Sequence, residues 1–171
     1  MTTYDSKTAQ VHVFTEKEGL LSAMAHDLEL AVTSFTVKAD EQAIEATFDA
    51  RSLKVLHPMK DGRPSSGLSE KDRADIEKNI VKDVLGAEKH PQIRFVSSAV
   101  KRDGATASVT GTLTLHGVSR PLSFTARSSS GAWVAEVPLH QPDYGIKPFS
   151  AMMGTLKIKP GVRVRITLPA T

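Results

Sequence analysis

Residues 105–124 read ATASVTGTLTLHGVSRPLSF and constrain the fold more than any other stretch of the chain. From residue 105 to 115 the odd positions are apolar or small, whereas the even positions from 106 to 116 are polar. A period of two is typical of a β-strand with one buried and one solvated face. Gly117 interrupts the pattern, and Leu122, Phe124 and Ala126 resume it. The sequence therefore predicts a strand, a short turn and a second strand, the repeating unit of an antiparallel sheet.

Similar strand-like runs recur along most of the chain, and we count eight or nine of them at short intervals. This spacing predicts an all-β sandwich or barrel rather than a parallel α/β sheet. The apolar segment 19–26 is compatible with a turn of helix or a buried strand. In the last pair, residues 156–168, the apolar positions are even, so we expect a three-residue loop at 159–161 with Ile158 facing Val162. Lys157 would then oppose Arg163, and we expect a carboxylate or open solvent beside them.

One segment has a helical period. Ser69 and Asp72 form an S-x-x-D pattern that is typical of a helix N-terminus. Apolar residues then recur on one side up to Gly86, at positions 76, 80, 81, 84 and 85. We expect one amphipathic helix at about residues 69–85, packed on the barrel or capping one end of it. A chain of 171 residues has the size of one domain, and we assign residues 1–171 to a single barrel domain.

The composition excludes several kinds of chemistry. The chain has no cysteine, which excludes disulfides, thiolate catalysis and Cys-ligated metal. Its six histidines are scattered without an H-x-H or H-x-x-x-H pair, so we expect no metal site. Nucleotide-binding glycine loops and the G-x-S-x-G elbow of hydrolases are also missing. We therefore expect no cofactor and assign no catalytic residue.

The charge pattern gives no sign of a nucleic-acid partner. The net charge is only +3, and the basic stripe Lys157, Lys159, Arg163 and Arg165 lacks interleaved aromatic residues. No apolar run is long enough to span a membrane, so we expect no stable membrane insertion. The first ten residues lack the basic and apolar regions of a signal peptide. We expect a cytoplasmic location, or a periplasmic one if a signal peptide has been removed.

The interior of such a barrel has two possible states. An eight-stranded barrel is just wide enough to be filled by its own side chains or to hold one small ligand. Several inward positions are small, and this leaves volume for a ligand. These positions are Ala46, Ala105, Ala107, Gly111 and Ala126. Neighbouring Leu and Phe side chains could equally fill the space, and the alternation alone leaves both states open.

Three runs of the sequence resemble the signature segments of the YceI-like family. They are KHPQIRFVSS at 89–98, GTLTLHGVSRPLSF at 111–124 and QPDYGIKPFS at 141–150. The family patterns read approximately K-[HY]-P-x-[IL]-x-F-x-S, G-x-L-T-[IL]-H-G-V-[ST]-[KR]-P and R-x-D-[FY]-G-I. Gln141 stands where the third pattern has Arg, and residues 146–154 differ from the family's Trp- and Asn-containing loop.

The resemblance implies an extended antiparallel lipocalin-like β-barrel that encloses a polyisoprenoid or fatty-acyl-like chain. We expect an apolar lining made by Leu30, Val32, Phe35, Phe48, Phe95, Leu113, Leu115, Phe124, Trp133 and Phe149. His116 and Arg120 are candidates for contact with a polar headgroup at the rim, or for a structural role at the Gly117 turn. The leading hypothesis is a non-enzymatic protein that sequesters or carries a long apolar lipid.

Two other functions remain open at this point. The first is an enzyme that holds an apolar substrate in the same cavity, with His26 and Asp27 or His116 as acid and base. The second is a filled barrel that acts through its surface as an interaction module, with a homodimer left open. For the binding hypothesis, part of the helix 69–85 or the loop 57–67 would serve as lid or entrance.

Overall fold

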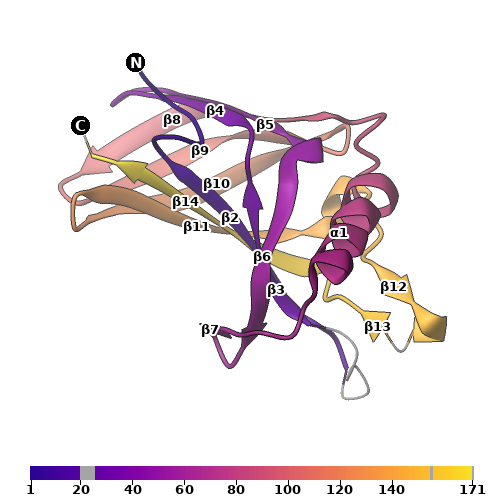
Figure 1. The fold of residues 1–171 in the computed structure, drawn as a ribbon. Helices are drawn as coiled ribbons and strands as arrows, with labels where there is room; N and C mark the ends of the chain where they lie inside the picture. The colour runs from indigo at the N-terminus through magenta and orange to yellow at the C-terminus, as the bar shows by residue number, and fades with distance from the viewer. Residues whose placement is uncertain (20–25, 155, 171) are drawn as a thin grey trace.

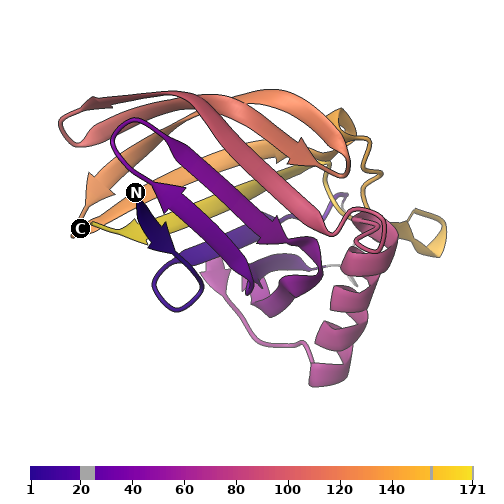
Figure 2. The same cartoon turned by 90° about the horizontal axis from the view of Figure 1, so that it is seen from above.

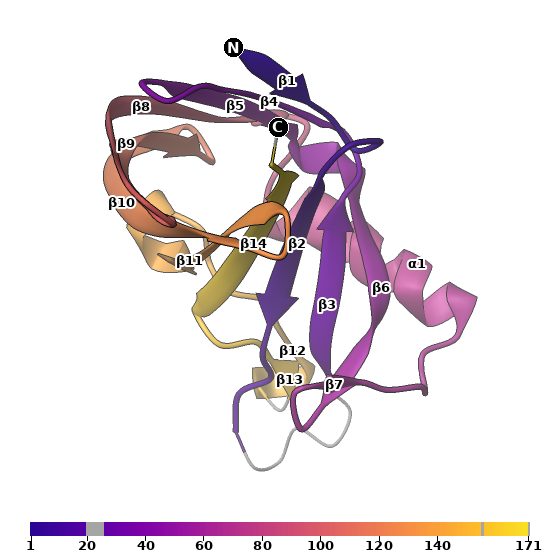
Figure 3. The ribbon, with the colours of Figure 1, turned by 90° about the vertical axis from the view of Figure 1, so that its left-hand side faces the viewer.

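One antiparallel sheet curls around the interior of the protein (Figure 1 and Figure 3). The structure is a computed structural model, and it describes residues 1–19, 26–154 and 156–170. Twelve strands of this part of the chain form the sheet. They are β1 Thr2–Tyr4, β2 Gln10–Thr15, β3 Asp27–Val32, β4 Phe35–Ala39, β5 Ile44–Asp49, β6 Leu53–Lys60, β7 Arg63–Pro64, β8 Gln92–Asp103, β9 Thr106–Leu115, β10 Val118–Ser129, β11 Ala132–His140 and β14 Gly161–Pro169. Most of the segment 19–26 lies outside the described residues.

The order of the strands explains how the sheet surrounds the interior. It runs β1-β4-β5-β8-β9-β10-β11-β14-β2-β3-β6-β7. β3 and β4 are separated only by residues 33–34, and β5 and β6 only by the 3-10 turn η1, Ala50–Ser52. The bent strand β3/β4 pairs with β2, and its bent partner β5/β6 pairs with β8. The predicted all-β, lipocalin-like fold is confirmed, although the sheet consists of twelve separate strands rather than eight or nine. If β1/β2 is also counted once, eight long strands remain.

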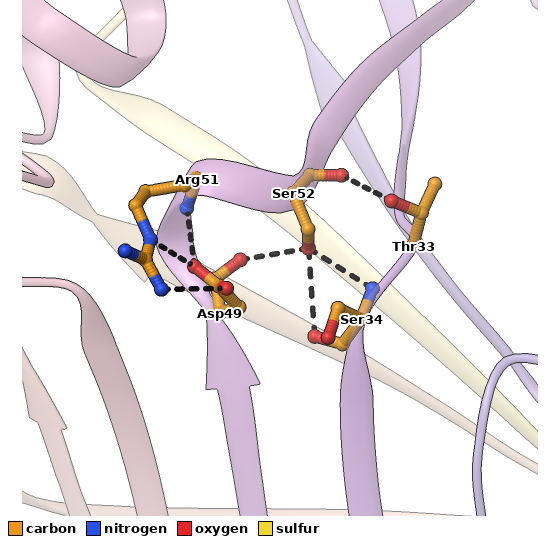
Figure 4. A network of polar contacts seen from close by, with 5 residues as sticks. All are labelled: Thr33, Ser34, Asp49, Arg51 and Ser52. Carbon is orange, nitrogen blue, oxygen red and sulfur yellow. Dashed lines mark hydrogen bonds and ion pairs between the residues drawn. The ribbon is translucent and has the colours of Figure 1, made fainter.

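A polar network holds the corner at which the two long strands bend (Figure 4). The Thr33 hydroxyl and backbone N–H both donate to the Ser52 carbonyl, at 2.8 and 3.1 Å. The Ser52 hydroxyl donates to the Asp49 carbonyl at 2.7 Å and accepts from the Ser34 N–H at 3.0 Å. Hydrogen bonds from Arg51 hold the pKa of Asp49 below its ordinary value. These bonds satisfy backbone groups that the interrupted ladder leaves unpaired.

The strand pair predicted from residues 105–124 is confirmed as β9 and β10. Their two-residue turn consists of His116 and Gly117, both with positive φ, as a type I′ hairpin turn requires. On β9 the odd residues from Val109 to Leu115 are buried, and the even residues from Ser108 to Thr112 are exposed. The alternation in the sequence therefore reports the two faces of the sheet.

The predicted hairpin at the end of the chain is wrong. β13, Leu156–Lys157, pairs with β12, Ser150–Ala151, and not with β14. Both edges of β14 are occupied, because β11 pairs with one and β2 with the other. Ile158 instead bonds back to the Phe149 carbonyl at 3.1 Å and forms a bridge with Lys17. The segment thus folds beside one end of the barrel, with the 3-10 turn η4, Met152–Gly154, between its two short strands.

One helix covers the same end of the barrel (Figure 2). It consists of α1, Glu70–Asn79, followed by a π-helical turn η2, Ile80–Val84, where the Leu85 N–H bonds to the Ile80 carbonyl at 2.8 Å. Ser69 caps the helix through a reciprocal bond pair with Asp72. The two chain termini lie at the opposite end. None of the helices in the described ranges is both long and apolar enough to cross a membrane.

Replacing Ser69 with alanine is expected to lower the free energy of unfolding by about 1 kcal/mol at pH 7. The change removes the hydroxyl oxygen that accepts the Asp72 N–H at 3.0 Å. Hydrogen bonds with Ser69 also lower the pKa of Asp72, so this part of the stability is present above about pH 4 and is lost as pH falls through the lowered pKa. Urea unfolding of both proteins should show a larger difference at pH 7 than at pH 3. Equal differences would exclude this coupling between Asp72 and the cap.

Candidate functional site

The interior of the barrel contains an apolar cavity of about 350 Å³. Inward-facing side chains of the long strands form its walls, and α1 with η2 covers part of it. Almost every lining side chain is a hydrocarbon or an aromatic ring. A volume of this size lies within the range of sites that bind small molecules. The barrel is therefore not filled by its own side chains.

The inward-facing side chains differ in burial from one strand to the next. Leu113 and Leu115 of β9 are buried in the hydrophobic core. Leu122 and Ala126 of β10 face the same interior but are only half-buried, and the inward residues of β14 are half-buried too. Apolar side chains that face inward and yet keep accessible surface border empty space. Ala46 and Ala126, two of the small residues noted in the sequence, lie on the cavity wall.

Most of the residues expected to line a ligand cavity lie on its wall. They are Leu30, Val32, Phe48, Phe95, Leu113, Leu115, Phe124, Trp133 and Phe149. These positions come from six different strands and one loop, which the alternating pattern orients toward the same interior. Contact of these side chains with a ligand remains a prediction.

Phe35 is the exception among the expected lining residues. It is 7% exposed and packs against Phe48, with the ring centroids 6.3 Å apart, but it is not part of the cavity wall. It follows the corner at Thr33 and Ser34 directly, where the strand bends away from the cavity. Val37, two residues further along β4, does line the cavity.

His116 and Arg120 do not lie on the cavity wall. His116 Nδ1 is 3.2 Å from the Tyr144 carbonyl, and its ring lies 4.6 Å from that of His90. Arg120 donates to the Asp143 carbonyl at 3.3 Å. Both side chains thus bind the β9–β10 turn to the 3-10 turn η3, Gln141–Tyr144, where burial raises the pKa of the Tyr144 phenol. This geometry favours the structural role that the sequence left open for them.

A second set of lining residues was not predicted from the sequence. The helix contributes Ile76, Ile80, Val84 and Leu85, and β14 contributes Val162, Val164, Ile166 and Leu168. The signals were present, because the helix has one apolar side and β14 alternates strictly. The missing information was which apolar surfaces meet, and this depends on the tertiary arrangement.

Four side chains give the cavity its polar groups. They are Thr15, His26, Asn79 and Gln141. The Gln141 side chain is 9% exposed and donates through Nε2 to the Lys159 carbonyl at 3.2 Å. Asp27, next to His26, accepts the Lys17 backbone N–H through Oδ1 at 2.7 Å. Among the residues that the structure describes, no group of three or more His, Cys, Asp or Glu side chains is arranged to hold a metal ion.

The outer face of the barrel carries a buried acidic group. Glu29 is 8% exposed, and its two carboxylate oxygens lie 3.0 Å from His12 Nδ1 and 2.6 Å from His57 Nε2. These residues come from β3, β2 and β6, three neighbouring strands. The bonds tie the strands together on the side opposite the cavity.

The two arginines of the expected basic stripe are neutralised on the same outer face. Arg163 and Arg165 lie over the ring of Phe14, at 4.7 and 4.6 Å from its centroid. Both guanidinium groups pair with Glu136, at 3.8 and 3.2 Å. Arg163 thus has a carboxylate beside it, but the expected pairing of Lys157 with Arg163 is wrong, because Lys157 lies opposite Ser150. Only the two arginines of the expected stripe lie on this solvated face of β14, whereas Lys157 lies on β13 and Lys159 pairs with Glu16 at 2.9 Å.

An antiparallel barrel wrapped around a hydrocarbon-lined cavity defines a lipocalin-like binding fold. The family model of the YceI-like domain matches residues 3–170. The chain therefore belongs to the YceI-like family, as the three signature runs indicated.

Relatives by sequence match parts of the chain. A UPF0312 protein of Pseudomonas putida strain W619 is 39% identical over 97 residues, 50% of each chain. Protein YceI of an Escherichia coli strain is 44% identical over 45 residues, 26% of this chain and 24% of that one. The chain spans about half the length of the first curated relatives it matches.

Solved structures share the fold over nearly the whole chain. BcnA of Burkholderia cenocepacia superposes with a TM-score of 0.67 at 20% identity, covering 98% of this chain and 99% of that one. A structure from Saccharophagus degradans, described as a polyisoprenoid binding domain, has a TM-score of 0.57 at 12% identity and covers 95% and 94%. These likenesses show the fold.

Proposed function

We propose that this protein binds a long isoprenoid or acyl chain in its interior, to sequester or carry it, and performs no reaction on it. The observation that carries the proposal is the cavity of about 350 Å³ with its almost entirely hydrocarbon wall. Water in such a cavity would find few hydrogen-bond partners, whereas an apolar chain replaces it favourably. The Saccharophagus degradans domain of the same fold is described as binding polyisoprenoids, which supports this ligand class.

The energetics are sufficient for a ligand without strong polar contacts. Each buried methylene contributes about 0.8 kcal/mol, so a chain of a dozen carbons contributes about 10 kcal/mol. The loss of translational and rotational freedom costs about 4–15 kcal/mol. A longer chain or a rigid isoprenoid therefore leaves a net affinity, and chain length is expected to govern it.

The geometry supports binding more than catalysis. His26 lines the cavity, which keeps it as the acid–base candidate of an enzyme. Asp27 and His116 are engaged elsewhere, with the Lys17 N–H and with the Tyr144 carbonyl. A general base needs a partner that orients it toward the substrate, and these bonds orient both groups toward the backbone.

Native mass spectrometry of the protein purified from its own host tests the proposal. We expect one long-chain lipid per protein chain, and organic extraction should release it for identification. The same lipid, incubated with the protein and extracted again, should be chemically unaltered. An unliganded mass that also fails to shift on titration with prenyl or acyl chains would contradict the proposal and favour a barrel that acts through its surface. A cargo converted to a new product during incubation would favour the enzyme.

A further inference from the structure

The polar groups of the cavity gather at one end of it. The Gln141 N–H and side chain bond to the carbonyls of Pro160 and Lys159, and the Lys159 N–H bonds to the Glu16 carbonyl. These bonds place Gln141 near the end of β2, where Thr15 lies. His26 immediately precedes β3, which pairs with that same end of β2, and Asn79 ends the helix that covers it. All four polar lining residues thus lie at the helix end.

The opposite end of the cavity is apolar. Trp133, Leu168 and Ala126 line it, close to the β10–β11 turn. Trp133 and Leu139 both line the cavity and are six residues apart on β11, a distance of about 20 Å along an extended strand. The cavity therefore has a long apolar part and a short polar part. A chain with one polar end fits it in a single direction, with its tail toward Trp133.

The polar end offers no permanent charge, and His26 is its one titratable side chain among the residues that the structure describes. No Lys, Arg, Asp or Glu side chain lines the cavity in the part of the chain that the structure describes. Thr15, Asn79 and Gln141 carry neutral hydroxyl and amide groups, which both donate and accept hydrogen bonds. A buried anion without a cation partner loses its hydration and gains little in return. A hydroxyl, a carbonyl or an amide loses far less.

We propose that the cavity selects chains whose polar end is uncharged, such as an alcohol, a ketone, an ester or an amide, over the corresponding phosphates and carboxylates. The inference rests on the proposed binding function and adds the class of headgroup and its direction in the barrel. The headgroup lies among Thr15, His26, Asn79 and Gln141, and the tail lies toward Trp133.

A matched pair of C15 probes tests this selectivity. Farnesol and farnesyl monophosphate have the same chain and differ in the charge of the end group. Trp133 is the only tryptophan of the protein and lines the cavity, so its fluorescence reports occupancy. We expect farnesol to bind roughly 100-fold more tightly, because no Lys or Arg side chain on the described cavity wall pairs with the phosphate. If the Kd values of the two probes differ by less than about tenfold, the inference is overturned and the binding function stays intact. Failure of both probes to bind overturns both.

A charge placed at the polar end tests the direction of the ligand. Asn79→Lys puts an ammonium group on the cavity wall. It is expected to reduce the difference in affinity between farnesol and farnesyl monophosphate by about tenfold or more. Ala74→Lys adds the same charge to the exposed, non-lining side of α1 and is expected to leave the difference as in the wild type. A difference that Asn79→Lys does not reduce, or that both variants reduce equally, overturns the placement of the headgroup.

Discussion

Gly111→Ala is expected to lower the midpoint of thermal unfolding by about 6–12 °C, which corresponds to about 3 kcal/mol in a chain of this length. A Cβ at this position would lie 2.3 Å from the Val96 carbonyl oxygen and 2.6 Å from the ring of Phe95. The neighbouring backbone must move, because a carbonyl in the β8–β9 ladder cannot rotate away. Glycine in a strand usually costs only about 0.5–1 kcal/mol of stability relative to alanine. The clash is larger than this gain, so the substitution is expected to lower the stability.

Gly161→Ala is the matched control. Gly161 begins β14, has no heavy atom within 4 Å of the position of a Cβ, and is not among the residues with positive φ. Alanine is expected to leave the midpoint unchanged or to raise it slightly. Differential scanning calorimetry of the three proteins measures both effects. Equal midpoints for the Gly111 and Gly161 variants would contradict the close packing of Phe95 on Gly111.

This glycine also shows how far the sequence predicts the cavity. The alternation correctly places Gly111 on the inner face, and its small size suggests space for a ligand. The space is instead taken by the ring of Phe95. Ala46 and Ala126 do border the cavity, whereas Ala105 and Ala107 do not. A period of two predicts which face a residue is on, but the neighbour that fills the space beside it comes from another strand.

The corner at residues 33–34 is a second feature that the sequence pattern does not predict. Up to Val32 the even residues of β3 line the cavity, whereas on β4 the odd residue Val37 does. Thr33 and Ser34 shift the alternation, because the bend is held by side-chain bonds to Ser52 and Asp49 rather than by the ladder. No local pattern announces such a corner. The hairpin predicted at 156–168 is wrong because both edges of β14 pair with strands outside this segment, which the alternation within the segment does not show.

The family signatures contain structural contacts as well as residues that line the cavity. His90, His116 and Tyr144 come from the three signature runs, and they meet where η3 packs against the β9–β10 turn. Gly117 stands beside the His90 ring, with a hypothetical Cβ 2.9 Å away. These runs therefore predict the fold well. Of the four polar lining residues, Gln141 lies in the third run, whereas Thr15, His26 and Asn79 lie outside all three.

Ala126→Trp is expected to weaken the binding of farnesol by about 100-fold or more while the protein remains folded. Ala126 is half-buried, faces the cavity and pairs with Ala107 and Ala135, so the space above it is open. An indole there occupies the apolar end that the tail would fill. Displacing four methylenes costs about 3 kcal/mol, which is roughly 100-fold in Kd. Isothermal titration calorimetry measures the change without relying on the tryptophan signal.

Thr125→Trp provides the control, since Thr125 is the adjacent residue of β10 and is exposed on the outer face. Farnesol should bind this variant as it binds the wild type. If the larger indole prevents folding, Ala126→Leu poses the same question with fewer added atoms and an expected loss of about tenfold. Unchanged affinity in the Ala126 variants would mean that the chain does not reach the Trp133 end of the barrel. Because only the direction of one side chain distinguishes positions 125 and 126, a loss confined to Ala126 separates occupancy of the interior from adhesion to the outer surface.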